Sequence, residues 1–489
     1  MADIKRFILK PTIEAINGIL HMENCKVEGI DGVPSLNKLT LNSGHFDLEF
    51  DATYRAVHPS VMIENLPELY IETPQAQYKI PEYNAHFEGT IMMGGDEDQH
   101  FDLRFSKLTQ KNLNVTKQYF WRFIYPVDSN EWFLKVQAYP YTDDFGSSHY
   151  FNLICPDLDG HQMNLFAVKV EGQNWMVIDS TESISYEEMD HRVMALTTSL
   201  GFVLGKRYGD YCFHIASEEP TFTDITGTEA LALQETRYCP FKILQTDNNL
   251  VEIWLSQHDY QQYALEELKN QLDGNVRWYY NDDATVTMDA FSKLSQLCYK
   301  TNDMLLATSM LIDGSMMNIE YQKPFFHVVL ETITSCLQTK DEDKPQPPMP
   351  QEQYKEVVVP ALIETLERIE GLSEEALRIF KSKIEHNLNT APNRNKLEAC
   401  FPALGYTLTK EDSDAIDKRN RTFHGHLTSE KQPLRVQQND LFAMSLRLHK
   451  LCSILLLKAA GFEGKVINNE VLFGMKPACE RRESVYIVI

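Results

Sequence analysis

Residues 440–460, DLFAMSLRLHKLCSILLLKAA, are the most apolar stretch with helical spacing in this chain. The apolar side chains recur at three- and four-residue intervals, at Leu441, Met444, Leu448, Leu451, Leu455 and Ala459. A helix with so wide an apolar face is stable only when other helices cover it. The stretch therefore predicts the central helix of a helical bundle.

Helical spacing continues from this stretch back to about residue 257. Apolar side chains predict further helices over 260–272, 288–312, 325–339, 354–369 and 373–388. Residues 340–353 are instead charged and rich in proline, which predicts an exposed loop. A short extended tail, 484–489, ends the chain. We therefore expect residues 257–489 to form an all-α domain.

Residues 1–256 show the two-residue alternation that is typical of strands. Apolar and acidic residues alternate over 46–50, as in a half-buried strand. Further strands are predicted over 101–105, 132–138, 165–170, 175–178, 211–215 and 251–255. One helix interrupts them, with a capping-box pattern at Ser185 and Glu188 and a stop signal at Gly201. We predict an α+β multidomain protein, in which a β-rich sensor or regulatory region precedes the helical bundle.

Charge is distributed unevenly along the chain. The whole chain carries 46 Lys and Arg against 70 Asp and Glu, a net charge of −24 that by itself argues against phosphate binding. From residue 401 onward the counts are 13 and 10, a net charge of +3. The first 400 residues keep 33 and 60, a net charge of −27. The acidity therefore belongs to the front of the chain, and the C-terminal part stays compatible with a polyanionic partner.

The sequence lacks the usual signs of membrane insertion and secretion. No apolar run approaches the roughly 18 residues of a membrane span, and residues 1–6 do not begin a secretory signal. The nine cysteines contain no CxxC pair, which predicts free, buried thiols and neither a zinc site nor a disulfide framework. We expect a cytoplasmic protein that binds no membrane and needs no metal or cofactor.

The residues best suited to chemistry precede the central helix, in the segment DKRNRTFHGH at 417–426. Histidine moves protons near neutral pH, and arginine is a permanent donor that binds phosphate. On a helix, Asn420 and His424 share one face, and the long side chain of Arg419 reaches the same pocket. This set suits metal-free cleavage of an RNA phosphodiester, with the 2′-hydroxyl as nucleophile and His424 as acid and base.

Two registers of this segment are open. Arg419 with His424 and Arg421 with His426 have the same spacing. We favour the first pair, because only there does Asn follow the arginine and Gly follow the histidine. Arg421, His426 and Lys418 are then candidate substrate-binding residues. Three apolar neighbours are expected to hold the segment on the bundle, namely Ile416, Phe423 and Leu427.

The stretch from Arg419 to Gly425 resembles the R-N-x-x-x-H motif of the HEPN superfamily of helical ribonucleases, in which glycine often follows the histidine. The layout, a long β-rich region followed by a helical bundle with this motif, is similar to that of the ApeA-like anti-phage proteins of bacteria. The resemblance implies that Arg419 and His424 are catalytic and that Asn420 supports them. It also implies a homodimer whose two motifs form one composite active site.

The resemblance implies a metal-independent endoribonuclease that acts on tRNA or other cellular RNA in anti-phage defence by abortive infection. A phage-derived trigger that binds the N-terminal region would regulate it. The alternative is a non-catalytic HEPN-like scaffold for dimerisation or binding. Other histidines lack ligand spacing and are interpreted as structural, including His86, His100, His191 and His214.

Overall fold

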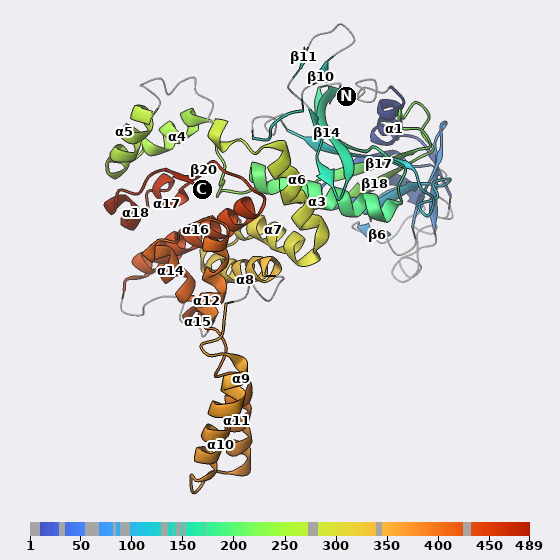
Figure 1. Cartoon of the computed structure of the whole chain (residues 1–489). Coiled ribbons are helices and arrows are strands. Elements are labelled where there is room, and N and C mark those ends of the chain that lie inside the picture. Colours follow the sequence, from blue (N-terminus) through green and yellow to red (C-terminus); the bar gives the residue numbers. More distant parts are fainter. Residues whose placement is uncertain are drawn as a thin grey trace.

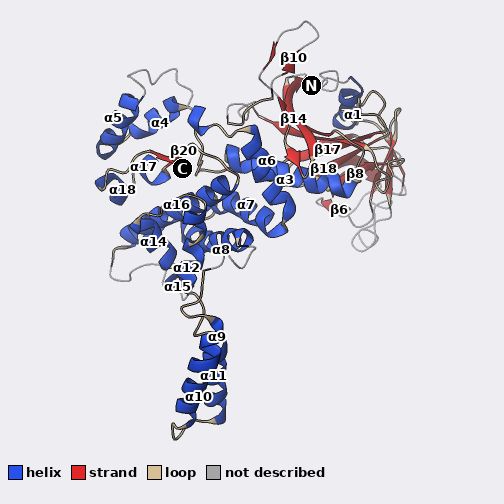
Figure 2. Cartoon of the chain, viewed as in Figure 1, coloured by secondary structure: helices blue, strands red, loops and turns tan. Residues whose placement is uncertain are grey.

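The computed structural model describes residues 10–28, 35–53, 68–81, 85–88, 98–128, 135–139, 141–142, 148–149, 153–170, 172–271, 282–338, 345–423 and 432–489. Strands predominate in its N-terminal part and helices in its C-terminal part (Figure 1, Figure 2). The predicted α+β class, with the β-rich region first, is confirmed.

A large antiparallel sheet forms the body of the N-terminal part. Its strands follow the order β1-β4-β5-β8-β18-β17-β9-β15-β14-β12, and β13 pairs with β14. Their bounds are β1 Lys26–Glu28, β4 Leu69–Glu72, β5 Gln77–Ile80, β8 Lys107–Gln110, β9 Phe120–Val127, β12 Leu153–Ile154, β13 Asp157–Leu158, β14 His161–Val170, β15 Gln173–Ser180, β17 Tyr211–Ser217 and β18 Gly227–Ala232. The strands predicted over 165–170, 175–178 and 211–215 are confirmed.

Smaller sheets flank this one. The four-stranded sheet has the order β2-β3-β7-β6, with β2 Lys38–Leu41, β3 Phe46–Thr53, β6 Ala85–Glu88 and β7 Asp98–Phe105. The two-stranded sheets pair β10 Tyr141–Thr142 with β11 Ser148–His149, and β16 Lys206–Arg207 with β19 Arg237–Tyr238. The strands predicted over 46–50 and 101–105 are confirmed. The strand predicted over 132–138 is reduced, within 135–139, to a single bridge from Val136 to Val286, and 132–134 lie outside the described residues.

Two helices cover opposite faces of the large sheet. Successive residues of β17 point to alternate faces, so Phe213 joins the core beneath α1 (Lys10–Leu20), where Ile16 is buried. Cys212 joins the core beneath α3 (Tyr186–Leu204), where Leu196 is buried. The sheet therefore carries two separate cores.

The start of α3 was predicted correctly and its end was not. The Ser185 side chain accepts a hydrogen bond from the Glu188 backbone N–H, as the capping-box pattern indicated. The helix continues through Gly201 and ends at Gly205, which has a φ of 68°. Glycine is needed at position 201 for close packing, because a Cβ there would lie 2.5 Å from the Lys206 carbonyl oxygen.

The C-terminal part consists mainly of helices, and two predictions made for this part differ from the structure. The helices are α4 Asn248–Leu255, α5 Gln262–Gln271, α6 Met288–Lys300, α7 Asn302–Gly314, α8 Ile319–Leu337, α12 Asn393–Glu398, α13 Cys400–Ala403, α14 Lys410–Asp417, α15 Arg419–Phe423, α16 Leu434–Ala459, α17 Asn469–Leu472 and α18 Lys476–Glu480. The strand predicted over 251–255 is wrong, because Asp247 caps a helix there and Val251 and Leu255 are buried one turn apart. The helix predicted over 288–312 is divided at Thr301, whose side chain caps α7.

The prediction of an all-α C-terminal domain is confirmed in part, because helices predominate there, and the extended tail predicted over 484–489 contains a strand. Strands β20 (Lys465–Ile467) and β21 (Tyr486–Val488) pair in an antiparallel sheet at the end of the chain. The alternation of apolar residues in the tail therefore belongs to a strand of a small two-stranded sheet beside the helices.

A helical hairpin projects from the bundle (Figure 1). It consists of α9 (Gln351–Gln353), the π-helical turn Tyr354–Val358, α10 (Val359–Glu367) and α11 (Glu374–His386), and we call it the arm. The exposed loop predicted over 340–353 is irregular over 345–350 and helical from Gln351 onward, while 339–344 lie outside the described residues.

One hydrophobic core runs across the predicted boundary at residue 257. It joins Trp121 of β9 and Leu196 of α3 to Leu294 of α6, Leu330 of α8 and Leu455 of α16. The sheet and the bundle thus bury apolar surface against a shared helix layer. Among the described helices, none has the length and apolarity to cross a membrane.

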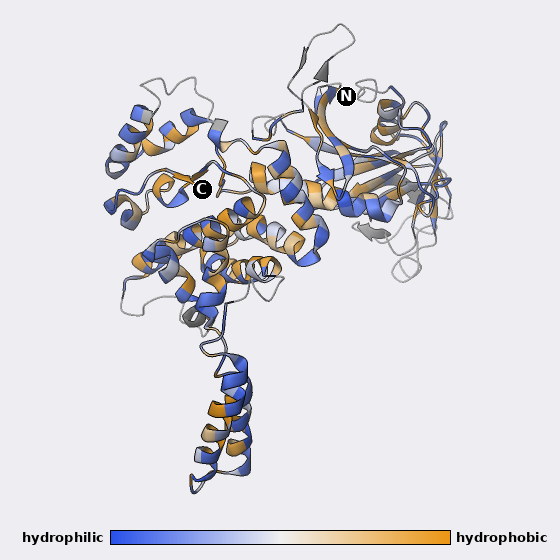
Figure 3. Ribbon diagram, viewed as in Figure 1, coloured by the Kyte–Doolittle hydropathy of each residue, from blue (hydrophilic) through white to orange (hydrophobic). Residues whose placement is uncertain are grey.

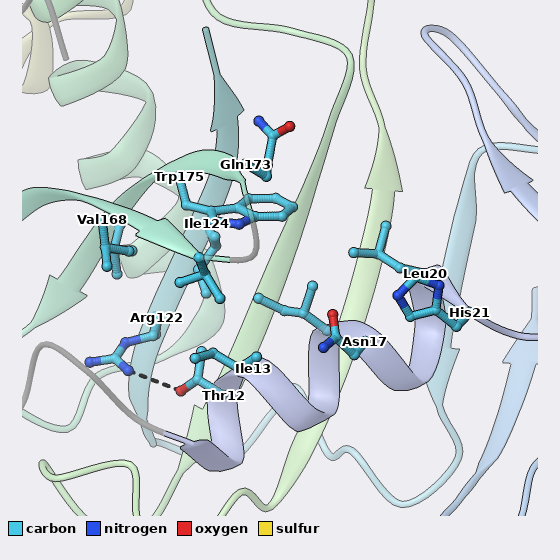
Figure 4. A pocket seen from close by; sticks show the side chains of 13 residues that line it. Thr12, Ile13, Asn17, Leu20, His21, Arg122, Ile124, Val168, Gln173 and Trp175 are labelled. Carbon is cyan, nitrogen blue, oxygen red and sulfur yellow. Dashed lines mark hydrogen bonds between the residues drawn. The ribbon is translucent and has the colours of Figure 1, made fainter. Parts of the chain in front are cut away.

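A buried ion pair fixes α1 to the sheet. Arg122 of β9 donates two hydrogen bonds to Asp179 of β15, both 2.7 Å long, and a third of 2.9 Å to Thr12 of α1. Figure 4 shows Arg122 and Thr12 at one end of an apolar cavity of about 200 Å³, which lies between α1 and the sheet and has Trp175 on its wall. The buried arginine of β9 thus has acceptors on two other elements, β15 and α1.

Candidate functional site

The segment that precedes the candidate site is anchored on the central helix. Thr409 and Asp412 form a capping box at the start of α14. Asp412 is buried and also lies 3.1 Å from Arg447 and 3.4 Å from Lys450 of α16. Although burial opposes its ionisation, the charges of these two residues lower the pKa of Asp412. The start of α14 is therefore anchored on α16.

The predicted motif begins on the short helix α15. Lys418 is exposed and separates α14 from α15, and its carbonyl accepts a hydrogen bond of 3.0 Å from the buried Thr422 hydroxyl. Arg419 is the first residue of α15, and the backbone places Asn420 and Arg421 within it. His424 and His426, with Leu427, lie outside the described residues.

Arg419 lies against α8. Its guanidinium forms an ion pair with Glu331 and covers the ring of Phe423, with 4.9 Å between the guanidinium carbon and the ring centroid. Ile416 is buried, as expected, but Phe423 is 44% exposed, and its ring lies near that of His327, with 6.3 Å between the ring centroids. The helix is therefore held by an ionic and aromatic contact as much as by apolar burial.

His327 is the most buried polar group beside α15. It is 0% exposed, and neither ring nitrogen has a hydrogen-bond partner among the residues that the structure describes. Burial, together with the positive charges of Lys323 and Arg419, lowers its pKa to about 3. The imidazole is therefore neutral at physiological pH, and it presents an uncharged donor and acceptor beside the motif.

Sequence reasoning missed the partners on α8. Lys323, His327 and Glu331 follow one another at four-residue intervals, so they lie in a row on the face that meets α15. Three ionisable residues at four-residue intervals were a detectable signal in the sequence of this helix. The sequence could not indicate that this row faces Arg419, because the two helices are far apart along the chain.

This arrangement is suited to binding a phosphate group without a metal. Arginine offers a planar fork of N–H donors for phosphate, and Glu331 fixes the orientation of that fork at Arg419. No cluster of three metal-ligating side chains occurs within the part of the chain that the structure describes.

Comparisons with protein-family models, curated proteins and solved structures found no match to this chain.

Proposed function

We propose that the protein is a metal-independent endoribonuclease, with Arg419 as the phosphate clamp, Asn420 as a positioning group and His424 as general acid and base. The RNA 2′-hydroxyl attacks the adjacent phosphorus, the 5′-oxygen leaves with a proton, and a 2′,3′-cyclic phosphate remains. The preferred substrate is tRNA or another cellular RNA, cut during anti-phage defence by abortive infection. A phage-derived trigger acting on the N-terminal region regulates the cleavage.

The position of Arg419 is the observation that carries this proposal. The motif starts on a helix that is docked on the bundle directly ahead of the long buried helix α16, and its arginine side chain is already oriented by Glu331. A cation fixed in this way loses little conformational freedom when it binds a phosphate. An arginine on a merely solvated helix face has no such constraint.

Cleavage of purified tRNA in EDTA tests the proposal. Wild-type protein is incubated alone and with extract of phage-infected cells, which supplies the trigger. We expect products with 2′,3′-cyclic phosphate ends, and a loss of at least about 100-fold in Arg419→Ala and His424→Ala. Arg368→Ala is the matched control, because it removes an exposed arginine of the arm that forms an ion pair with Glu364. Equal cleavage by all four proteins contradicts the assignment.

The same assay decides the register of the motif. Arg421→Ala and His426→Ala are expected to weaken substrate binding and to leave the maximal rate within about threefold of wild type. If these two substitutions abolish cleavage while Arg419→Ala does not, the second register is correct.

One observation supports dimerisation, which is the role that the alternative, a scaffold, gives to this part of the chain. The arm exposes large apolar side chains on both of its long helices, including Leu362, Ile379 and Phe380. Figure 3 shows hydrophobic positions interspersed with hydrophilic ones along the arm. Soluble monomers rarely expose such a group together, and two arms packed against each other would form a four-helix unit. Homodimerisation through the arm is compatible with either function.

Sedimentation of Phe380→Glu separates these roles. Phe380 is 45% exposed, so the substitution leaves the protomer folded and charges the apolar face. We expect a wild-type dimer and a monomeric variant. A dimeric wild type without RNA cleavage under triggered conditions supports the scaffold over the nuclease.

A further inference from the structure

A second polar constellation lies in the N-terminal part, far from the RNA motif, on the face of the large sheet that α3 covers. Cys212 and His214 are two residues apart on β17 and point to the same face. Glu229 of β18 is paired directly with His214 in the ladder. Cys212 Sγ lies 3.2 Å from His214 Nε2, and Glu229 Oε1 lies 3.5 Å from His214 Nδ1. The side chains are 2% exposed or less.

The hydrogen bonds determine the tautomer of His214. The Tyr186 hydroxyl donates to Glu229 over 2.9 Å, and its oxygen lies 3.0 Å from His214 Nδ1. Because the single hydroxyl proton goes to the carboxylate, Nδ1 carries the hydrogen and donates to the Tyr186 oxygen. Nε2 then keeps its lone pair, which faces the Cys212 thiol. Stacking on Phe123, with ring centroids 3.5 Å apart, holds the imidazole in this orientation.

The surrounding groups keep the thiol and imidazole neutral at rest. Burial raises the pKa of Cys212, with the charges of Glu229 and Asp190 adding to the effect. Burial also lowers the pKa of His214, although Glu229 opposes this. Burial opposes ionisation of Glu229 as well, but its contact with His214 and its ion pair with Lys107 lower its pKa. The result is a neutral thiol next to a neutral base, backed by a carboxylate.

This pair borders a cavity. The space of about 280 Å³ lies between β17, α3 and α7, and both Cys212 and His214 are on its wall. Met194, which is 48% exposed, marks its opening to solvent. The buried Lys206 also lines it, so one wall is cationic. Asp190 lies there too, but burial raises its pKa and so reduces the charge that would oppose an anion.

We propose that Cys212, His214 and Glu229 form a thiol site for a small, negatively charged acyl compound. Cys212 Sγ bonds to the carbonyl carbon as the bond to the leaving group breaks. The thiol proton moves to His214 Nε2 and then to the leaving group, while Glu229 stabilises the transient imidazolium. Water hydrolyses the thioester and restores the thiol. Lys206 attracts the anionic substrate.

Relative alkylation rates in the native protein test the nucleophile without any substitution. Cys298 and Cys452 are buried as completely as Cys212, but their sulfurs contact the Thr308 hydroxyl and the Phe326 carbonyl. With iodoacetamide and mass spectrometry, we expect Cys212 to react at least about tenfold faster than both. Equal rates would show that reaction needs unfolding, which overturns the proposal.

Two further measurements test the acyl class and the charge. Acetyl phosphate is expected to acetylate Cys212 transiently, and absence of that adduct in wild type overturns the acyl assignment. Lys206→Met is expected to lower the ratio of iodoacetate to iodoacetamide reaction at Cys212 several-fold. An unchanged ratio overturns the role of Lys206. His214→Gln should slow the alkylation of Cys212 and leave that of Cys298 unchanged. Faster alkylation of both cysteines would identify an unfolded variant.

Discussion

The guanidinium of Arg419 on α15 forms an ion pair with the carboxylate of Glu331 on α8. Both side chains are partly exposed, with 24% and 34% accessible, so the pair lies at the surface of the bundle and is open to solvent. The carboxylate orients the arginine and also neutralises part of its charge. These two effects have opposite consequences for phosphate binding.

Substitution of Glu331 separates the two effects. Glu331→Gln keeps an oxygen acceptor for the guanidinium and removes the negative charge, so we expect RNA to bind several-fold more tightly. Glu331→Ala removes the orienting acceptor too, and we expect slower cleavage at saturating RNA. Binding and single-turnover cleavage of labelled tRNA provide the measurement. Weaker binding by the Gln variant would contradict the competition between carboxylate and phosphate.

The shared core predicts the behaviour of a truncated chain. A fragment of residues 257–489 loses α3, which packs on α6 and α7, and so exposes Leu294 and its apolar neighbours. We expect the fragment to aggregate or to bind a hydrophobic dye, while the full chain does neither. A soluble, cooperatively unfolding fragment would show that the bundle is an independent domain.

The buried pair of Arg122 and Asp179 predicts a large loss of stability on neutralisation. The two side chains are 1% and 2% exposed. Asp179→Asn preserves the shape but leaves the arginine charge buried, so the free energy of unfolding should fall by about 3–5 kcal/mol. Glu218→Gln is the control, because its pair with Lys117 is exposed and should have no measurable effect on denaturant unfolding.

His449 predicts a component of acid denaturation. It is buried on α16 between Phe241 and Phe326, and burial lowers its pKa to about 3. The unfolded chain takes up the proton near pH 6.5, so stability falls as pH drops from there towards 3. In His449→Phe, the slope of unfolding free energy against pH should shrink by about 1.4 kcal/mol per pH unit over this range.

The exposed His386 of α11 supplies the control for that slope. His386→Gln should leave the pH dependence of unfolding as in wild type. An unchanged slope in His449→Phe would mean that another group takes up the proton.

Local patterns predicted much of the secondary structure. They failed where the same pattern is compatible with more than one structure. The Ser185 cap predicted the start of α3, because its hydrogen bond to the Glu188 N–H is made within four residues. Gly201 misled, because its lack of a side chain serves close contact with Lys206 and not a helix end. The strand predicted at 251–255 failed because a short apolar run fits a strand or one helix face equally well.

The sequence by itself determined the central helix, the alternation of the sheet and the composition of the motif at 417–426, because spacing along the chain reflects which face is buried. Only the tertiary structure placed Glu331 and His327 beside Arg419, and aligned Cys212 and His214 with Glu229 next to a cavity. The physical reason is that these contacts join separate helices or strands. Their register is decided by packing across the whole core, and no local pattern records it.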